Sequence, residues 1–284
     1  MTLTGRQLAL LPALWMLGGF GCRQAPPAPG PMASMLVGMA AELGDAPADV
    51  PRAWGVLEDI AARVAKRARP RRPGGDAGAT VDALNAVVFD ELGFEREIAR
   101  GDPRFFRLVS VLEDRRGSCV GLGVLYLAVA ERLGVRLEGI MVPGHFFVRV
   151  PAGAETPARN VELLRRGEAM PDEWYRMKYG PWPDDGRAYL RPLTVEEVEA
   201  VHWFNLGNHL RATRAPLAAE KAYQRAVAAF PNFAEAHASL GAVRQLVGQV
   251  GPAAEAYSAA ARIRPDLPGL TGNVERLNQR RETR

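Results

Sequence analysis

Cysteine and histidine are scarce in this sequence, which has two cysteines and four histidines among 284 residues. Two cysteines, Cys22 and Cys119, are too few to build a disulfide framework. The histidines lack partners at metal-ligand spacing, so we expect no metal site and no cofactor. A strong excess of one charge is also lacking. The 36 basic and 32 acidic residues give a dispersed net charge of +4, so we expect no nucleic-acid partner.

A hydrophobic run long enough to span a bilayer is lacking as well. Residues 8–20 are apolar but too short for a membrane-spanning helix. The run ends at Gly21-Cys22, before the proline-rich stretch APPAPGP, and this pattern is similar to a bacterial lipoprotein signal. We therefore predict a signal peptide over 1–22, lipidation of Cys22, and attachment to the membrane of the bacterial cell envelope, facing the periplasm. The alternatives are a secreted protein or a short membrane anchor.

The periodicity of apolar residues changes along the chain. Residues 23–50 are expected to be a tether followed by a first helix. The helical pattern, with its three- and four-residue spacing, covers 32–43, 53–68, 81–93, 102–117 and 119–133. The alternating pattern of strands covers 136–142, 145–150 and 159–164. We expect 165–195 to be irregular and rich in aromatic residues.

Cys119 stands at the start of the apolar helix 119–133, directly after the capping residue Ser118. A thiol there lies at the positive end of the helix dipole, which favours the thiolate. His145 is the only histidine between residues 23 and 199, and it begins a predicted strand. Asn160 and Glu162 share one face of the next strand. A cysteine, a histidine and an acid or amide in this order are typical of cysteine nucleophiles. A packed thiol with no chemistry is the structural alternative.

The C-terminal third repeats itself with a period of 34 residues. The positions that recur are Leu206, Gly207, Ala219, Tyr223, Ala226 and Pro231, matched by Leu240, Gly241, Ala253, Tyr257, Ala260 and Pro265. This period and spacing resemble the tetratricopeptide repeat, a pair of helices. We predict repeats at 200–233 and 234–267, within an all-α region over 196–284, and a capping helix over 269–281.

The stretch RRGSCVGLGVLYLAVAERLGVRLEGIMVPGHFFVRV, preceded by the helical segment LNAVVFDELGFE, resembles the bacterial transglutaminase-like superfamily. The resemblance implies an α+β fold over 51–195, a papain-like core in which a helix bundle packs on a small antiparallel sheet. It implies that Cys119 is the nucleophile and His145 the general base. Glu162 matches the position of the third catalytic residue, and Asn160 is the alternative.

Other residues are candidates for substrate binding. Trp174 and Tyr175 are candidates for the wall of a substrate groove, although packing over the sheet is the default explanation for such residues. Arg116 is a candidate for holding a substrate carboxylate, with a salt bridge as the alternative.

Two functions remain open from the sequence. The first is an envelope-associated cysteine hydrolase or acyltransferase that acts on a peptide or isopeptide amide, while the repeats recruit a protein or peptide partner. The second is an inactive scaffold that binds partners through its repeats, because a fold does not by itself confer activity.

Overall fold

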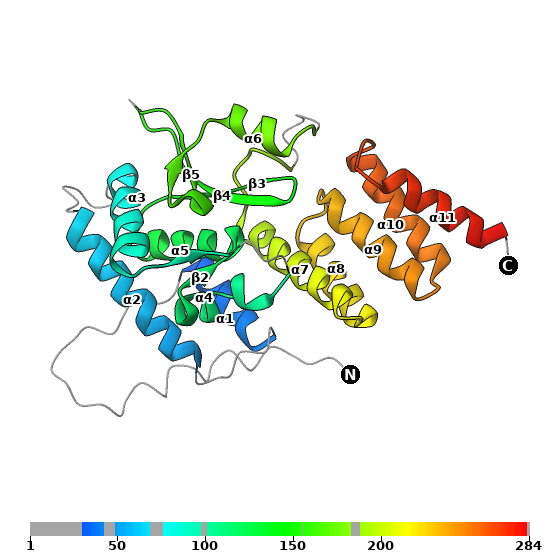
Figure 1. Cartoon of the computed structure of the whole chain (residues 1–284), viewed down its shortest axis with the longest axis horizontal. Helices are drawn as coiled ribbons and strands as arrows, with labels where there is room; N and C mark the ends of the chain where they lie inside the picture. Colours follow the sequence, from blue (N-terminus) through cyan, green and yellow to red (C-terminus); the bar gives the residue numbers. More distant parts are fainter. Residues whose placement is uncertain are drawn as a thin grey trace.

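The computed structural model describes residues 30–42, 49–68, 76–97, 101–154, 156–182 and 188–282 (Figure 1). The predicted signal peptide over 1–22, including Cys22, lies outside these residues. In the described part of the chain, no helix is both long and apolar enough to cross a membrane. The described residues form a mixed core, followed by a helical region that extends to the C-terminus.

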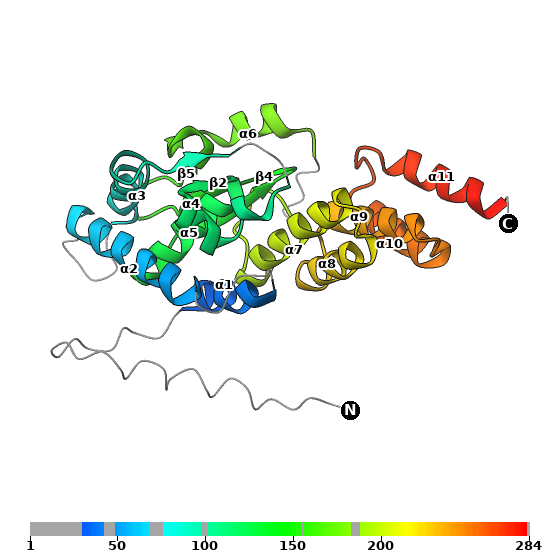
Figure 2. The same ribbon diagram turned by 60° about the horizontal axis from the view of Figure 1, so that its bottom comes forward.

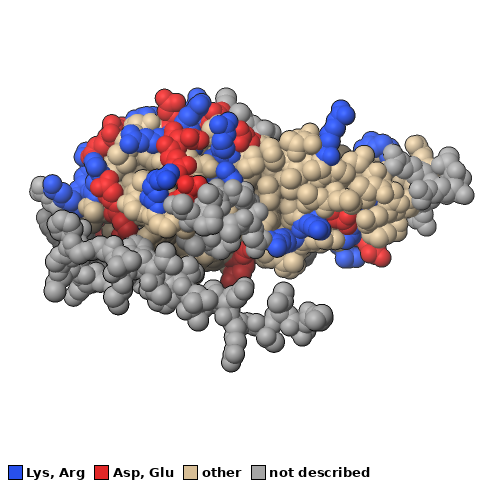
Figure 3. Space-filling view, turned by 90° about the horizontal axis from the view of Figure 1, so that it is seen from below, with Lys and Arg blue, Asp and Glu red and all other residues tan. Residues whose placement is uncertain are grey.

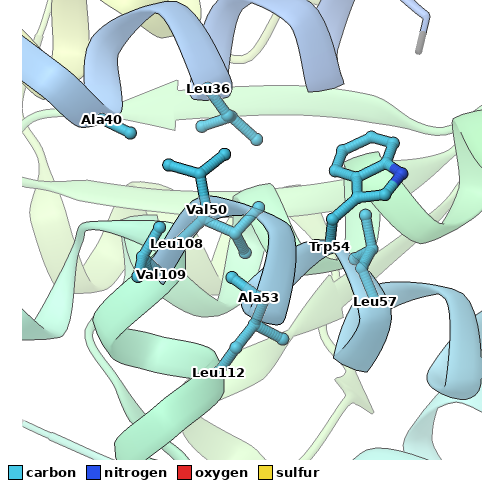
Figure 4. A pocket seen from close by; sticks show the side chains of 9 residues that line it. All are labelled: Leu36, Ala40, Val50, Ala53, Trp54, Leu57, Leu108, Val109 and Leu112. Carbon is cyan, nitrogen blue, oxygen red and sulfur yellow. The ribbon is translucent and has the colours of Figure 1, made fainter. Parts of the chain in front are cut away.

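Helices build the first half of the core. They are α1 (Pro31–Glu42), α2 (Asp49–Ala68), α3 (Ala77–Asn85), the π-helix η2 (Ala86–Glu91), the 3-10 helix η3 (Pro103–Phe105), α4 (Leu108–Asp114) and α5 (Cys119–Arg132). Helix α3 begins earlier than the sequence predicts, because the Asp76 side chain accepts hydrogen bonds from the Gly78 and Ala79 backbone amides. Helix α1 packs against α5 and α7, and its Leu36 lines a small apolar pocket together with Ala53 on α2 and Leu108 on α4 (Figure 4).

The expected single helix over 102–117 is wrong. The chain forms η3, turns, forms α4, and then ends that helix at Arg115, which adopts a left-handed conformation with φ of 50°. The next two residues form the short strand β2 (Arg116–Gly117), which pairs in parallel with β1 (Glu95–Arg96). This break lets the chain turn sharply before α5 begins.

A four-stranded antiparallel sheet lies against α5. The strands, in spatial order, are β3 (Glu138–Val142), β4 (His145–Val150), β5 (Arg159–Glu162) and β6 (Glu168–Ala169). Side chains alternate along β4 as predicted. Phe146 points into the core that contains α5, and Phe147 packs on the opposite face.

Helix α6 (Asp172–Tyr179) covers the second face of this sheet, so the sheet is a middle layer between α5 and α6 (Figures 1 and 2). The sequence prediction of an irregular 165–195 is therefore wrong for residues 172–179. Tyr175 is fully buried, and its ring stacks on Phe147 with 3.9 Å between centroids.

The C-terminal region consists of helices that pack in sequence. They are α7 (Val195–Ala212), α8 (Pro216–Ala229), α9 (Ala234–Leu246), α10 (Val250–Ile263) and α11 (Leu270–Glu282). Gly207 on α7 lies against the Tyr223 ring on α8, and Gly241 on α9 lies against the Tyr257 ring on α10. A Cβ atom at either glycine would stand 2.6 Å from a ring carbon, so the absent side chain lets each helix pair approach closely.

Helix α1 is fixed to the far end of α5. The Glu131 carboxylate accepts hydrogen bonds from the Met32 and Ala33 backbone amides at 3.0 and 3.1 Å. These amides have no acceptor within their own helix, and Glu131 therefore caps α1 from another part of the chain. Acidic and basic side chains are interspersed over the core on the face drawn in Figure 3.

Candidate active site

Cys119 is a half-buried free thiol in the first turn of α5. The predicted cap is confirmed, since the Ser118 side chain accepts a hydrogen bond from the Gly121 backbone amide at 3.4 Å. The Ser118 amide in turn donates to the Phe105 carbonyl oxygen at 2.7 Å. Gly121 lies directly against that carbonyl, where a Cβ atom would collide with it. The turn before α5 is thus packed tightly, and it fixes the position of Cys119.

Gly123 brings the sheet close to the first turns of α5. The space that a side chain would occupy at Gly123 is filled by the ring of Phe146, which is 1% exposed. Because Phe146 directly follows His145, this close approach holds the start of β4 beside the start of α5. The glycines around Cys119 therefore have a packing role that positions the thiol and the imidazole relative to each other.

His145 lies between Cys119 and Glu162. The Cys119 side chain lies close enough to the imidazole to raise its pKa. Its Nε2–H donates to the Oε2 atom of Glu162 at 2.7 Å, which leaves Nδ1 for the thiol. Glu162 is 1% exposed, and its Oε1 atom accepts from the Leu164 backbone amide at 3.0 Å. Both carboxylate oxygens are thus engaged, and the Glu162 side chain is held in one orientation.

The surroundings of His145 favour its protonated form. Burial lowers the pKa of His145, but hydrogen bonds to Cys119 and Glu162 and the charges of both groups outweigh burial and raise it from 6.5 to about 9. A carboxylate beside a buried imidazole stabilises the imidazolium in this way. At neutral pH the ring therefore carries a proton that it can return to a reacting group.

Aromatic side chains hold the imidazole from the α6 side. The Tyr179 ring stacks on His145 with 4.7 Å between centroids and an interplanar angle of 4°. The Tyr175 ring stacks further away, at 6.1 Å. Burial, and then the nearby Glu162 carboxylate, raise the pKa of Tyr175 well above its ordinary range, so its hydroxyl stays neutral. Sequence analysis did not single out Tyr179, although its spacing of four from Tyr175 was visible.

Asn160 forms a separate network. Its Oδ1 atom accepts from Arg149 Nε at 2.6 Å, and its Nδ2 group donates to Asp172 at 2.7 Å and to the Met170 carbonyl at 2.9 Å. Its side chain is directed to the start of α6 and to Arg149. The geometry beside His145 therefore favours Glu162 over Asn160.

A cavity of about 130 Å³ lies directly beside Cys119 and His145. Its walls come from both the core and the C-terminal helical region. The lining residues are Cys119, Val120, Met141, Val142, Gly144, His145, Phe146, Tyr189, Val201, Phe204, Asn205, Phe233 and Glu235. The sequence analysis missed the contribution of α7 and α9, because no local pattern predicts how two regions of a chain pack together.

The three predicted substrate-binding residues lie outside this cavity lining. Tyr175 is fully buried beneath the sheet face, and the half-buried Trp174 meets it edge to face at 4.9 Å. Arg116 is exposed, and its Nη2 group lies 2.7 Å from the Glu97 carboxylate. These positions correspond to the packing and salt-bridge alternatives. Among the described residues, no group of three or more histidine, cysteine or acidic side chains is arranged to hold a metal ion.

Comparison with known families agrees with this architecture. A family model described as the transglutaminase-like superfamily matches residues 53–199, slightly more than half of the chain. The chain belongs to the transglutaminase-like superfamily. The matched region contains most of α2, all helices from α3 to α6, and the whole four-stranded sheet, and it leaves α1 outside.

Relatives with similar sequences occur in bacteria and animals. A UPF0162 protein of Pseudomonas aeruginosa is 33% identical over 149 residues, covering 51% of this chain and 53% of that protein. A UPF0162 protein of Xylella fastidiosa is 41% identical over 70 residues, covering 24% of this chain and 25% of its own length. F-box only protein 21 of Mus musculus is 37% identical over 76 residues, 26% of this chain and 12% of that protein. The chain thus spans about half or less of the length of these relatives.

Among solved structures, one that covers 84% of this chain and 72% of its own is titled as a crystal structure of menin that reveals the binding site for Mixed Lineage Leukemia (MLL) protein. Its sequence identity is 14% and its TM-score is 0.38, which is too low to establish a common fold.

Proposed function

We propose that this protein is a cysteine hydrolase or acyltransferase that attacks an amide of a peptide or isopeptide through Cys119, His145 and Glu162. The observation that supports it is the placement of the His145 imidazole, hydrogen bonded to the Glu162 carboxylate and near the Cys119 thiol, beside a cavity large enough for part of a substrate. Membership of the transglutaminase-like superfamily is consistent with acyl chemistry on this fold.

In the proposed reaction, His145 holds the proton of Cys119 as an imidazolium beside the thiolate, and the thiolate attacks the amide carbonyl carbon. The Cys119 backbone N–H, which lies in the first turn of α5, donates to the developing oxyanion. His145 then donates its proton to the leaving amine, and a thioester remains on Cys119. Water or a second amine attacks the thioester and releases the free thiol. Glu162 stabilises the imidazolium and fixes its orientation throughout.

The nucleophile is tested by alkylation with iodoacetamide in a full-length Cys22→Ser protein, where Cys119 is the remaining cysteine. We expect Cys119 to react faster than free cysteine near pH 7, because the neighbouring imidazolium stabilises the thiolate. His145→Ala should slow this reaction by about tenfold or more, since the thiol then lacks the neighbouring cation that stabilises its thiolate.

The control is His209→Ala, which removes a histidine on α7 that is absent from the cavity lining. It should leave the alkylation rate unchanged. A thiol that reacts in urea but is inert in the folded protein would contradict the proposed enzymatic activity. That result would favour the scaffold, in which the same fold serves only to bind partners.

We also propose that α7–α11 are tetratricopeptide repeats with a terminal capping helix, and that they recruit a protein or peptide partner. The equivalent contacts of Gly207 with Tyr223 and Gly241 with Tyr257, 34 residues apart, support the repeat. A groove of about 490 Å³ between α9, α10 and α11 supports the partner role. A partner captured by the full-length protein should be lost when Leu246, a 61% exposed residue of this groove, is changed to Asp.

We propose further that the protein is held to the cell envelope by lipidation of Cys22. The apolar run that ends at Gly21-Cys22 supports this. Cys22→Ser should move the protein from the membrane fraction to the soluble periplasmic fraction of a bacterial host. Unchanged membrane association would refute lipidation, and release of the unaltered protein into the medium would favour the secreted alternative.

A further inference from the structure

The cavity beside the candidate nucleophile is lined by residues from two regions of the chain. Cys119 and His145 form the wall that belongs to the core. Val201, Phe204 and Asn205 on α7, with Phe233 just before α9, belong to the C-terminal region. We call these four residues the helical wall. A group on the Cys119 sulfur that occupies this cavity therefore also meets residues of the helical wall.

The helical wall is rigid and mainly apolar. The Phe204 and Phe233 rings pack on each other with 4.7 Å between centroids, and Phe204 also contacts Tyr223 at 6.0 Å. Phe233 and Val201 are buried. Across the cavity, Val142 adds another buried apolar side chain. These contacts restrain the rings, so the shape of the wall limits what the cavity accepts.

The volume sets the size of the group that fits. At about 130 Å³, the cavity is close to the engineered protein cavity of about 150 Å³ that binds benzene. A compact group of about six non-hydrogen atoms therefore fits beside Cys119. A bulkier aromatic or branched group requires the wall to move.

Two lining residues carry hydrogen-bond acceptors that have no donor among the described residues. Asn205 Nδ2 donates to the Val201 carbonyl at 2.8 Å, which fixes the amide and leaves Oδ1 without a hydrogen bond in the described part of the chain. Glu235, another lining residue, accepts from the Tyr189 hydroxyl through Oε1. Its Oε2 atom is buried and has no partner among the described residues. A group that donates hydrogen bonds satisfies these acceptors, whereas one without N–H or O–H does not.

We propose that the helical wall selects the substrate group next to the bond that Cys119 attacks. That group is compact, mainly apolar, and carries an N–H donor that reaches Asn205. The inference rests on the proposed function, because it takes the thiol as the nucleophile. It makes the C-terminal helices part of the substrate site, in addition to any role in recruiting a partner.

Methanethiosulfonate reagents test this directly. The Cys119 thiolate attacks their sulfenyl sulfur, a mixed disulfide forms, and methanesulfinate leaves. The 2-aminoethyl reagent is compact and carries N–H donors. The 2-(trimethylammonio)ethyl reagent carries the same charge on a bulkier group without an N–H. Their rate ratio at Cys119, in the full-length Cys22→Ser protein, therefore reports size and donor preference at equal charge. The same ratio in urea gives the intrinsic reagent difference.

We expect folding to raise this ratio by about tenfold in favour of the aminoethyl reagent, which is the effect of one hydrogen bond plus the steric limit. Asn205→Leu removes the acceptor with little change in volume. It should abolish most of the increase in the rate ratio that folding produces. Asn273→Leu is the matched control, because Asn273 lies on α11 and lines a different groove. It should leave the ratio unchanged.

A second variant tests the shape of the wall without touching the acceptor. Phe204→Leu trims the ring, and it should raise the relative rate of the trimethylammonio reagent several-fold. Leu217→Ala, an exposed position on α8, is its control. The inference is overturned if Cys119 reacts rapidly but the ratio equals that in urea, or if Asn205→Leu and Asn273→Leu behave alike. Slow reaction of Cys119 with every reagent in the folded protein would instead refute its proposed role as the nucleophile.

Discussion

Replacing Glu162 with glutamine tests the charge that stabilises the His145 imidazolium. Glutamine keeps an oxygen that accepts from Nε2, but it removes the negative charge 2.7 Å away. The pKa of His145 is raised from 6.5 to about 9, because its hydrogen bonds and charges with Cys119 and Glu162 outweigh the opposing effect of burial. That difference corresponds to roughly 3 kcal/mol in favour of the protonated folded state. Loss of the carboxylate should lower this pKa by about one unit and the stability near pH 6 by about 1 kcal/mol.

The direction with pH follows from the raised pKa. The folded state binds the His145 proton more tightly than the unfolded state does. Its contribution is therefore complete below about pH 6.5 and is lost as the pH rises through about 9. Burial lowers the pKa of His202 and His237. These two residues therefore destabilise the folded state as the pH falls below about 6.5, which is the opposite of the effect of His145. Between about pH 6.5 and 9, the change in stability therefore reflects His145 and not His202 or His237.

Urea unfolding measured at about pH 6 and about pH 10 gives the free energies to compare. We expect the unaltered protein to lose more stability between these values than Glu162→Gln does. Glu168→Gln is the control, because Glu168 is an exposed carboxylate on the neighbouring strand whose partner is Arg165. Titration of the His145 ring by NMR gives the pKa itself. Equal pH dependence in Glu162→Gln and the unaltered protein would refute the reasoning.

Two further changes test the packing that supports the site. Gly123→Ala should lower the free energy of unfolding by about 1–3 kcal/mol, because the new methyl group meets the buried Phe146 ring, whereas Gly55→Ala on α2 meets nothing and should stabilise by about 0.5–1 kcal/mol. Equal midpoints of thermal denaturation for Gly123→Ala and Gly55→Ala would contradict the close approach of Gly123 and the Phe146 ring. Arg264→Ala should cost about 3 kcal/mol, since it leaves the Glu235 carboxylate without its cation, and Arg264→Met should cost less. Urea unfolding of both variants checks this order, and an equal loss would assign the effect to the lost charge alone, because methionine keeps most of the packing of the arginine stem.

Local patterns in the sequence predict the elements that carry the candidate site. Ser118 marks the start of a helix, and strict alternation places His145 and Phe147 on one face of a strand. The choice between Asn160 and Glu162 was not accessible, since both share that face and only the register of β4 with β5 decides which one reaches the imidazole.

Other features depended on contacts that no short window contains. Helix α6 was missed because its eight residues between Pro171 and Gly180 carry aromatic and charged side chains without a clear apolar stripe. The left-handed conformation of Arg115, which breaks the expected long helix, gives no signal in composition, as glycine would have done. The second wall of the cavity depends on how α7 packs against the core, a contact between residues far apart in sequence.

The capping of α1 by Glu131 has a geometric consequence for an anchored protein. Glu131 lies at the far end of α5 from Cys119, and a helix of 14 residues is about 21 Å long. The stretch from Cys22 to Gly30 reaches at most about 30 Å when fully extended. Under the proposed lipidation, the Cys119 sulfur therefore stays within about 50 Å of the bilayer surface. Residues inserted between Cys22 and Gly30 would increase the distance from the membrane at which Cys119 can reach a substrate, without altering the proposed chemistry.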